Sequence, residues 1–346
     1  MEIRIPNYFT SQKFYEEIVR SVNKAVGEEE IITLDFTEVQ RMDAVVVPSL
    51  LVLGLYIRDK SGYMPVIRLG ENIQAGHLKK YLYGIQFTKH ARDVFLFEND
   101  PYNGMYGVRM HPSNTTQCFQ YYTFDDLDEE EKRQKNFELQ SEIMRRIELN
   151  LVPFLREFAS EFVVNFSELV QDDLEIGNNY LAKYMFHLVE NAYDHARSSI
   201  YITVQVNYMT QKVYISAADY GMGFKAAFLN ALLGSKTQKE SERFAYNILN
   251  REPQNELEAI IIGMYKRKYS ASVKRGLYQV IEKTLDLNGL IRVHSNETQV
   301  IITQKIKNKF LNEELADDLL NGRLKYNVRS DVMLPGTHIE IEIPLK

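Results

Sequence analysis

The chain has 346 residues, of which 45% are hydrophobic and 25% are charged, and its formal net charge at pH 7 is -6. This length is enough for about two domains, and the acidic balance argues against a general nucleic-acid-binding protein, which would carry a basic excess. The single cysteine, Cys118, excludes an intramolecular disulfide framework. The amino terminus lacks a signal-peptide pattern, and the longest nearly apolar run, residues 44–57, is too short to span a bilayer. We therefore expect a cytoplasmic protein with no membrane segment.

The first 97 residues alternate apolar runs typical of strands with the three- and four-residue spacing typical of helices. We expect strands at 2–8, 31–36 and 64–69, and helices at 11–26, 44–58 and 73–83. The helix at 44–58 is almost entirely apolar, which predicts a buried position. Strands that alternate with helices indicate a small α/β domain over residues 1–97.

The pattern changes between residues 98 and 149. Loop-forming residues accumulate from 98 to about 120, and the acidic run 125–131 then opens a helical segment with a kink or break at Pro153. Acidic residues in the first turn of a helix interact favourably with the helix dipole, so a solvated helix start explains this run better than a partner-binding patch. We expect a loop and helical linker over 98–149 and a second domain over 150–346.

The helix expected over residues 179–198, which we call the motif helix, gathers polar side chains on one face. Residues three or four apart are neighbours on a helix. This face therefore carries His187, Glu190, Asn191, Asp194 and His195. The opposite face is apolar and suits packing against a sheet. A magnesium ion bound together with a nucleotide needs only one or two protein ligands, and Asn191 could supply one; the alternative is an asparagine that only forms hydrogen bonds within its helix.

Two alternating segments, 200–206 and 213–218, follow the motif helix and predict a β-hairpin. The hairpin ends in Asp219, and Gly221 and Gly223 come directly after it. A carboxylate at a strand end can accept a hydrogen bond from the exocyclic amine of a purine, and glycines let the backbone approach the ring closely. A turn-forming sequence is the alternative. Together with the polar helix face, these residues suggest a nucleotide site.

The segment Lys274-Arg275-Gly276-Leu277 precedes a helix that we expect over residues 278–287. Free backbone N–H groups at a helix amino terminus attract anions, and the two basic side chains add positive charge. This segment therefore predicts a phosphate-binding position, with a plain helix start as the alternative. Strands are expected at 290–295, 299–304 and 338–343. Thr337 directly precedes the last of these, and its hydroxyl could reach a purine edge through a water molecule.

These segments, in this order, resemble the GHKL ATP-binding fold of gyrase-type topoisomerases, mismatch-repair ATPases, the large heat-shock chaperones, histidine kinases and anti-sigma serine kinases. The resemblance covers about residues 150–346 and implies a Bergerat α/β sandwich with a mixed sheet, in which residues 224–274 form a lid over ATP. It implies that Asn191 is the Mg²⁺ ligand, that Asp219 reads adenine and that Thr337 assists through water. It also implies contacts to ATP from the neighbouring motif residues Asp194, His195, Gly221, Gly223, Lys274, Arg275, Gly276 and Leu277.

Two departures from the family pattern bear on catalysis. Members that hydrolyse ATP place a glutamate four residues before the metal-binding asparagine, and His187 occupies this position here. Histidine can act as a general base near neutral pH, so His187 is one candidate catalytic residue. Glu190 is the other, although it points about 100° away from Asn191 around the helix. The second glycine segment also lacks the usual run of glycines, and no phosphate-accepting histidine helix precedes it, which argues against an autophosphorylating histidine kinase.

Residues 1–97 resemble a STAS domain, the fold of anti-sigma-factor antagonists, in their pattern of strands and helices. Regulatory members carry a phosphate-accepting serine directly after an aspartate at a helix start, but here Asp43 is followed by Ala44. A helix N-cap is the simpler interpretation of Asp43. Ser49 lies more than one turn into the helix, and Thr37 is displaced from the expected position. The STAS-like domain therefore has no acceptor where the resemblance implies one.

We expect a STAS-like regulatory or interaction domain joined to a GHKL domain that binds Mg-ATP. The protein would act as a nucleotide-dependent switch, in which Mg-ATP orders the lid and changes a protein interface, with slow or absent hydrolysis. A separate protein partner or a homodimer would complete this interface. Two enzymatic alternatives stay open: a protein serine/threonine kinase of the anti-sigma type, and a true ATPase with His187 as the base.

Overall fold

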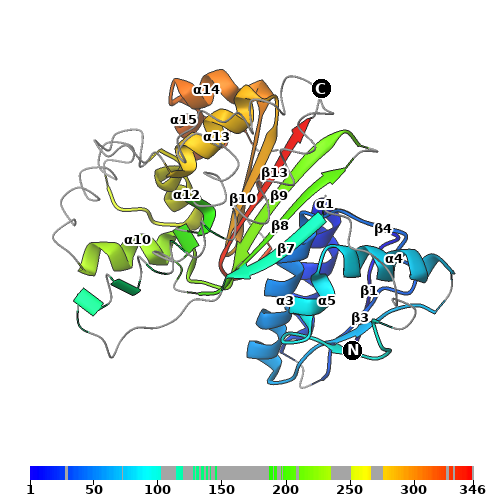
Figure 1. Ribbon diagram of the computed structural model, residues 1–346. Helices are drawn as coiled ribbons and strands as arrows, with labels where there is room; N and C mark the ends of the chain where they lie inside the picture. The colour runs from blue at the N-terminus through cyan, green and yellow to red at the C-terminus, as the bar shows by residue number, and fades with distance from the viewer. Residues whose placement is uncertain are drawn as a thin grey trace.

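The computed structural model describes residues 1–27, 30–71, 73–102, 114–119, 187–189, 191, 192, 196, 198–207, 210–234, 251–265, 276–324, 327–329 and 332–344, with isolated positions between 128 and 145. Two larger sheets organise this part of the chain (Figure 1). A four-stranded sheet lies in residues 1–102, which we call the amino-terminal half, and a seven-stranded sheet lies further along the chain. Helices pack against both sheets, so the fold is α/β, as expected.

Parallel strands form the sheet of the amino-terminal half. Its order is β1 (Glu2–Arg4), β3 (Thr33–Asp35), β5 (Val66–Arg68) and β6 (Leu96–Phe97), and a separate parallel pair joins β2 (Tyr8–Phe9) to β4 (Arg41–Met42). Parallel neighbours require long crossover connections. These contain α1 (Ser11–Lys13), η1 (Phe14–Val19), α2 (Arg20–Ala25), α3 (Val46–Ser61), α4 (Ile73–Gly84) and α5 (Phe87–Ala91). The expected alternation of strands and helices is confirmed.

The carboxy-terminal sheet is antiparallel at every pairing. Its order is β12 (Val328–Arg329), β11 (Thr298–Thr303), β10 (Leu290–Ser295), β13 (Thr337–Pro344), β9 (Lys212–Asp219), β8 (Ile200–Asn207) and β7 (Asn114–Phe119). The expected hairpin is confirmed as β8–β9. The expected mixed sheet is wrong, because β13 lies between β9 and β10, which run in the same direction, and is antiparallel to both.

β7 lies in the segment that we expected to be a loop and helical linker. It pairs with β8, with Cys118 opposite Tyr201, and forms one edge of the sheet. Its polar sequence lacks the apolar alternation by which the other strands are recognised. The loop interpretation of this stretch is wrong because a strand distant in the chain, and not the local pattern, determines its structure.

Both faces of the carboxy-terminal sheet are covered (Figure 1). One face, which we call the helix-layer face, packs against α10 (Gly223–Gly234), α12 (Glu256–Tyr265), α13 (Gly276–Asp286), α14 (Lys307–Leu311) and α15 (Glu314–Leu320). The other face, the back face, packs against the amino-terminal half, where α3 contacts β8 and β9. Successive residues of a strand point to opposite faces, so Ile339 and Ile341 join the helix-layer core while Tyr214 and Ala218 join the core of the amino-terminal half.

α3 lies between the amino-terminal sheet and the back face, and most of its residues are buried (Figure 1). Its sequence is almost entirely apolar up to Arg58, which is the pattern of a helix enclosed in a core. The helix ends at Gly62, whose left-handed conformation (φ 75°) stops it. The buried helix expected at 44–58 is confirmed. Among the described residues, no helix is both long enough and apolar enough to cross a membrane.

Candidate functional site

A cavity of about 100 Å³ lies between the sheet and the helix layer, at the carboxyl end of β9. By a similar measure one water molecule needs about 10–15 Å³, so the cavity has room for a ligand fragment several times larger. Its walls are mostly apolar, and α10 contributes two aromatic rings. The sequence-predicted residues in the lining are Asn191, Asp219, Gly223, Leu277 and Thr337. They come from four separate segments of the chain, because Asp219 and Gly223 belong to one segment.

Asp219 is the one acidic or basic side chain among the described residues of the cavity lining. It ends β9 and is 3% exposed. Its Oδ1 accepts hydrogen bonds from the backbone N–H groups of Gly221 (2.8 Å) and Thr337 (3.2 Å). Burial outweighs these two bonds and raises the pKa of the Asp219 carboxyl group to about 7. The carboxyl group is therefore held in one orientation, and a ligand that donates a hydrogen bond to Oδ2 would stabilise its ionised form.

The glycines after Asp219 make room for protein atoms. A Cβ on Gly221 would overlap Ala196 of the motif helix. Gly223 has φ 77°, which favours glycine, and a Cβ there would overlap the side chain of Asn296. We expected these glycines to let the backbone approach a bound ring, but in the structure it is other parts of the chain that approach them. They shape the wall that holds Asp219.

Residues 334–337, which we call the closing loop, bring Thr337 against Asp219. Gly336 has φ 94°, and a Cβ on it would overlap the carbonyl oxygen of Asp219. This approach of the two backbones lets the N–H group of Thr337 reach Asp219 Oδ1. The structure therefore places the backbone N–H group of Thr337 against the Asp219 carboxylate. The role of the Thr337 hydroxyl stays a prediction.

Asn296 joins the two loops that flank Asp219, and the sequence patterns did not identify it. Its Oδ1 accepts from the N–H group of Gly336 (3.2 Å), its own N–H group donates to Gly336 O (3.1 Å), and its Nδ2 donates to Met222 O (3.1 Å). Asn296 occupies the turn between β10 and β11 with φ 48°. Asparagine in a short hairpin turn is a known signal for such a backbone, but nothing local connects it with Asp219.

Glu256, at the start of α12, is a second residue that the sequence patterns missed. It is buried, and its carboxylate accepts from Asn296 Nδ2 (2.7 Å), from the Ser295 hydroxyl (2.8 Å) and from the N–H group of Lys225 (3.2 Å). Ser295 Oγ in turn accepts from the N–H group of Phe224 (2.9 Å). These bonds fix the first turns of α10 and α12 to the β10–β11 hairpin.

The predicted lid, residues 224–274, contributes two helices to the cavity wall. α10 provides Phe224 and Phe228, and α12 provides Gly263. A Cβ on Gly263 would overlap the Phe224 ring, so glycine at this position lets the two helices approach each other. Residues 235–250 and 266–274 of the predicted lid lie outside the described residues.

Asn191, which lines the cavity, is half-buried on the motif helix. The remaining predicted site residues have other positions, and Gly276 begins α13, where a helix start was expected. His187 is 6% exposed and is not among the described residues that line the cavity. Its role as a general base stays a prediction. Five predicted residues lie outside the described part of the chain: Glu190, Asp194, His195, Lys274 and Arg275.

The Mg²⁺ ion that the GHKL resemblance implies would need oxygen ligands at the cavity. Within the described residues, no three or more His, Cys, Asp or Glu side chains are grouped to hold a metal ion. Mg²⁺ usually keeps several waters and takes phosphate oxygens together with one or two protein ligands. Asn191 lines the same cavity as Asp219, so its side-chain amide can supply an oxygen ligand there. The site therefore fits a magnesium ion that is bound through a nucleotide.

The amino-terminal end of α3, where the STAS resemblance implies a regulatory serine, faces the back of the carboxy-terminal sheet. Ala44 and Val45 are buried, and the Ser216 hydroxyl donates a hydrogen bond of 2.8 Å to the carbonyl oxygen of Val45. The N-cap interpretation of Asp43 is wrong, because α3 begins at Val46 with Val45 as its cap residue and has no side-chain cap hydrogen bond. Burial raises the pKa of the Asp43 carboxyl group. This helix end is closed by the sheet.

Comparisons of this chain with protein-family models, with curated proteins and with solved structures found no match. The chemistry of the cavity is therefore the basis for assigning a function. The cavity combines apolar and aromatic walls with one asparagine and one buried carboxyl group that is held by backbone donors.

Proposed function

We propose that the cavity binds the adenine ring of Mg-ATP and that the protein acts as a nucleotide-dependent protein-interaction switch. The observation that carries this proposal is the convergence of Asn191, Asp219, Gly223, Leu277 and Thr337 on one cavity. These residues come from four segments that are far apart in the sequence, and they follow the order of the motifs that resemble the GHKL fold. Residues from motifs that matched by chance would not be expected to line the same cavity.

Adenine suits this cavity because it combines apolar faces with one hydrogen-bond donor at its edge. The rings of Phe224 and Phe228 and the aliphatic walls match the faces of a planar ring. The exocyclic amine would donate to Asp219, whose Oδ1 is already occupied by Gly221 and Thr337. Binding would then stabilise the ionised carboxylate against the burial that raises its pKa.

The phosphates would lie toward Asn191 and the start of α13. A helix amino terminus presents free N–H groups to an anion, and α13 begins at Gly276 with Leu277 in the cavity lining. Asn191 would hold the magnesium ion that accompanies the phosphates. Hydrolysis would be slow or absent, because His187 occupies the sequence position of the usual glutamate and does not line the described cavity.

Calorimetric titration of the full chain with Mg-ATP tests the proposal. Asp219→Asn keeps the side-chain shape but replaces a charged acceptor with an amide. We expect ATP affinity to fall about 10-fold or more, the scale of one charge-assisted hydrogen bond. Asp35→Asn is the matched control, because Asp35 is also buried at a strand end and also accepts from the N–H group two residues on, that of Thr37 (3.0 Å). Unchanged ATP affinity in Asp219→Asn would contradict the adenine assignment.

The same site could serve either enzymatic alternative, and one incubation separates them. After exposure to Mg-ATP, mass analysis of nucleotide and protein reports binding, hydrolysis and phosphotransfer together. A protein kinase would need a separate target, because Ala44 supplies no hydroxyl at the STAS position and is buried. A true ATPase with His187 as base would lose phosphate release in His187→Ala while still binding ATP.

A further inference from the structure

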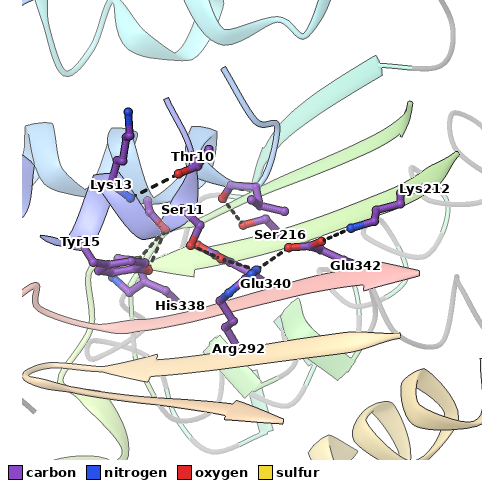
Figure 2. Close-up of polar contacts among 12 residues, drawn as sticks. Thr10, Ser11, Lys13, Tyr15, Lys212, Ser216, Arg292, His338, Glu340 and Glu342 are labelled. Carbon is purple, nitrogen blue, oxygen red and sulfur yellow. Dashed lines mark hydrogen bonds and ion pairs between the residues drawn. The ribbon is translucent and has the colours of Figure 1, made fainter. Parts of the chain in front are cut away.

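The strand β13 carries the proposed nucleotide site on one face and a contact with the amino-terminal half on the other. Thr337 and Ile339 line the cavity, whereas His338 and Glu340 point toward the amino-terminal half. Figure 2 shows this back-face contact, with Tyr15 beside His338 and Ser11 beside Glu340. One strand therefore separates the cavity from the amino-terminal half.

His338 forms hydrogen bonds in both directions across this contact. Its Nε2 lies 3.1 Å from the carbonyl oxygen of Pro335 in the closing loop, and its Nδ1 lies 2.9 Å from Ser49 Oγ of α3. A carbonyl oxygen only accepts, so Nε2–H is the donor and Nδ1 accepts from the Ser49 hydroxyl. Burial lowers the pKa of His338 to about 4, which agrees with this neutral form. Ser49 is completely buried.

His294 supports the same loop from the neighbouring strand β10. Its Nε2–H donates to Leu334 O (3.2 Å), and its ring lies 4.8 Å from the ring of Tyr15. The N–H group of Leu334 donates to Asn296 O (2.9 Å). Two buried histidines and one asparagine thus hold the closing loop, and the N–H group of Thr337, at the end of this loop, donates to Asp219 Oδ1.

We propose that His338 is a positioning residue through which the amino-terminal half sets the closing loop and thereby the nucleotide affinity of the cavity. The proposal rests on the nucleotide site proposed above. The path has three links: Ser49 orients His338, His338 holds Pro335 O, and the loop places Thr337 N–H on Asp219. Coupling between two sites is reciprocal, so bound nucleotide would also stabilise the docking of α3.

A second serine at this interface supplies a matched control. The Ser11 hydroxyl is buried and donates to Glu340 Oε2 (2.6 Å). It therefore joins the amino-terminal half to β13 as Ser49 does. No hydrogen bond in the described residues connects Ser11 or Glu340 to the closing loop. Loss of Ser11 should weaken the interface without moving Thr337.

The experiment compares Ser49→Ala with Ser11→Ala in the full chain, at a temperature where both are folded. We expect Ser49→Ala to lower Mg-ATP affinity about 2- to 10-fold, the scale of one net hydrogen bond, and Ser11→Ala to leave it unchanged. Hydrogen–deuterium exchange without nucleotide gives a second readout. The amides of Leu334, Gly336 and Thr337 should exchange faster in Ser49→Ala than in Ser11→Ala.

Equal ATP affinities and equal loop exchange in the two variants would overturn the inference. If the wild-type chain binds no adenine nucleotide, the proposed function fails, and the exchange comparison still decides whether Ser49 controls the closing loop. Should Ser49→Ala not fold, Ser49→Cys keeps the shape of the side chain with a weaker donor and should give the same changes at smaller size. Loop exchange equal to wild type in a folded Ser49→Cys would also count against the inference.

Discussion

The two faces of the carboxy-terminal sheet each bury a carboxyl group, in different surroundings. On the helix-layer face, Asp219 accepts only backbone N–H groups and lines a cavity. On the back face, Glu340 accepts from the Ser11 hydroxyl at 2.6 Å and lies 3.5 Å from the guanidinium of Arg292. Burial raises the pKa of both carboxyl groups to about 7.

A raised pKa therefore does not by itself distinguish a ligand site from a structural one. The groups that contact each carboxyl group make this distinction. Glu340 is covered by the amino-terminal half and has protein groups of its own, including a cation, whereas Asp219 faces open space without a cation among the described residues around it. A buried acid that borders a cavity can be satisfied by a ligand, so only Asp219 is expected to respond to nucleotide.

The largest expected effect concerns the back face. Arg292 lies 2.6 Å from Glu342 Oε1 and 3.5 Å from Glu340 Oε2, and Arg292→Met would leave both acids without this cation. Breaking a buried ion pair costs about 3–5 kcal/mol, so we expect the unfolding free energy in urea at pH 7 to fall by about 3 kcal/mol. Mg-ATP affinity should hardly change.

Arg68→Met is the control for that variant. Arg68 also pairs with two glutamates, Glu2 and Glu98, each at 2.5 Å, but these groups are well exposed. Exposed pairs contribute about 0–1 kcal/mol. If the two arginine variants lost the same stability, the back-face network would be no more important than a surface network.

The pH dependence of stability gives the next largest effect. The Asp219 carboxyl group has an ordinary pKa of 3.8 and a folded pKa of about 7, so between these values the folded state holds the extra proton. This contribution to stability is complete below pH 4 and is lost as the pH rises through 7. Asp219→Asn removes that loss, and its unfolding free energy relative to wild type should rise by about 2 kcal/mol from pH 4 to pH 8. This is less than the ~4 kcal/mol of three pKa units, because relaxation and water penetration around the ionised carboxylate reduce the cost of its burial.

Glu340→Gln sharpens the comparison between the faces. The folded pKa of the Glu340 carboxyl group is also raised, from 4.5 to about 7. The stability of Glu340→Gln relative to wild type should therefore change with pH in the same direction as that of Asp219→Asn. Each of the two variants removes one part of the pH dependence of wild-type stability. Saturating Mg-ATP should suppress the part that comes from Asp219 and leave the part that comes from Glu340. Suppression of both parts, or of neither, would show that the two carboxyl groups do not differ in access to ligand.

The residues that the sequence predicts correctly are those with a local signal. Period-two alternation predicts β8, β9 and β13. The acidic strand end followed by glycines singles out Asp219, which lines the cavity in the structure. Asn296 and Glu256 have no such signal, because their partners come from distant segments and only folding brings them together. The alternation in β13 also marks His338 and Glu340 as one face without showing that the amino-terminal half covers it. Pairing between distant segments likewise determines that the carboxy-terminal sheet is antiparallel and that β7 is a strand.

A smaller effect is expected at Asn296, which braces the cavity side. Asn296→Gly keeps the left-handed backbone but removes the side-chain bonds to Met222, Glu256 and Gly336. We expect the unfolding free energy to fall by about 1–2 kcal/mol, because buried polar partners lose their bonds, and Mg-ATP affinity to fall as well. Asn288→Gly is the matched control, since Asn288 also has a positive φ (57°) but is exposed. Equal results for both variants would contradict the role of Asn296.

The smallest effect is expected where the two halves touch in solvent. The Tyr220 hydroxyl donates to Asp59 Oδ2 (2.9 Å) near the end of α3, next to Asp219 in the sequence. Because this bond is exposed, Tyr220→Phe should lower the unfolding free energy by about 0.5 kcal/mol or less. The control is Tyr63→Phe, because Tyr63 is an exposed tyrosine of the amino-terminal half. The two variants should have the same Mg-ATP affinity. A loss of affinity as large as that expected for Ser49→Ala would mean that any contact between the halves adjusts the cavity, and that the buried path through His338 is not special.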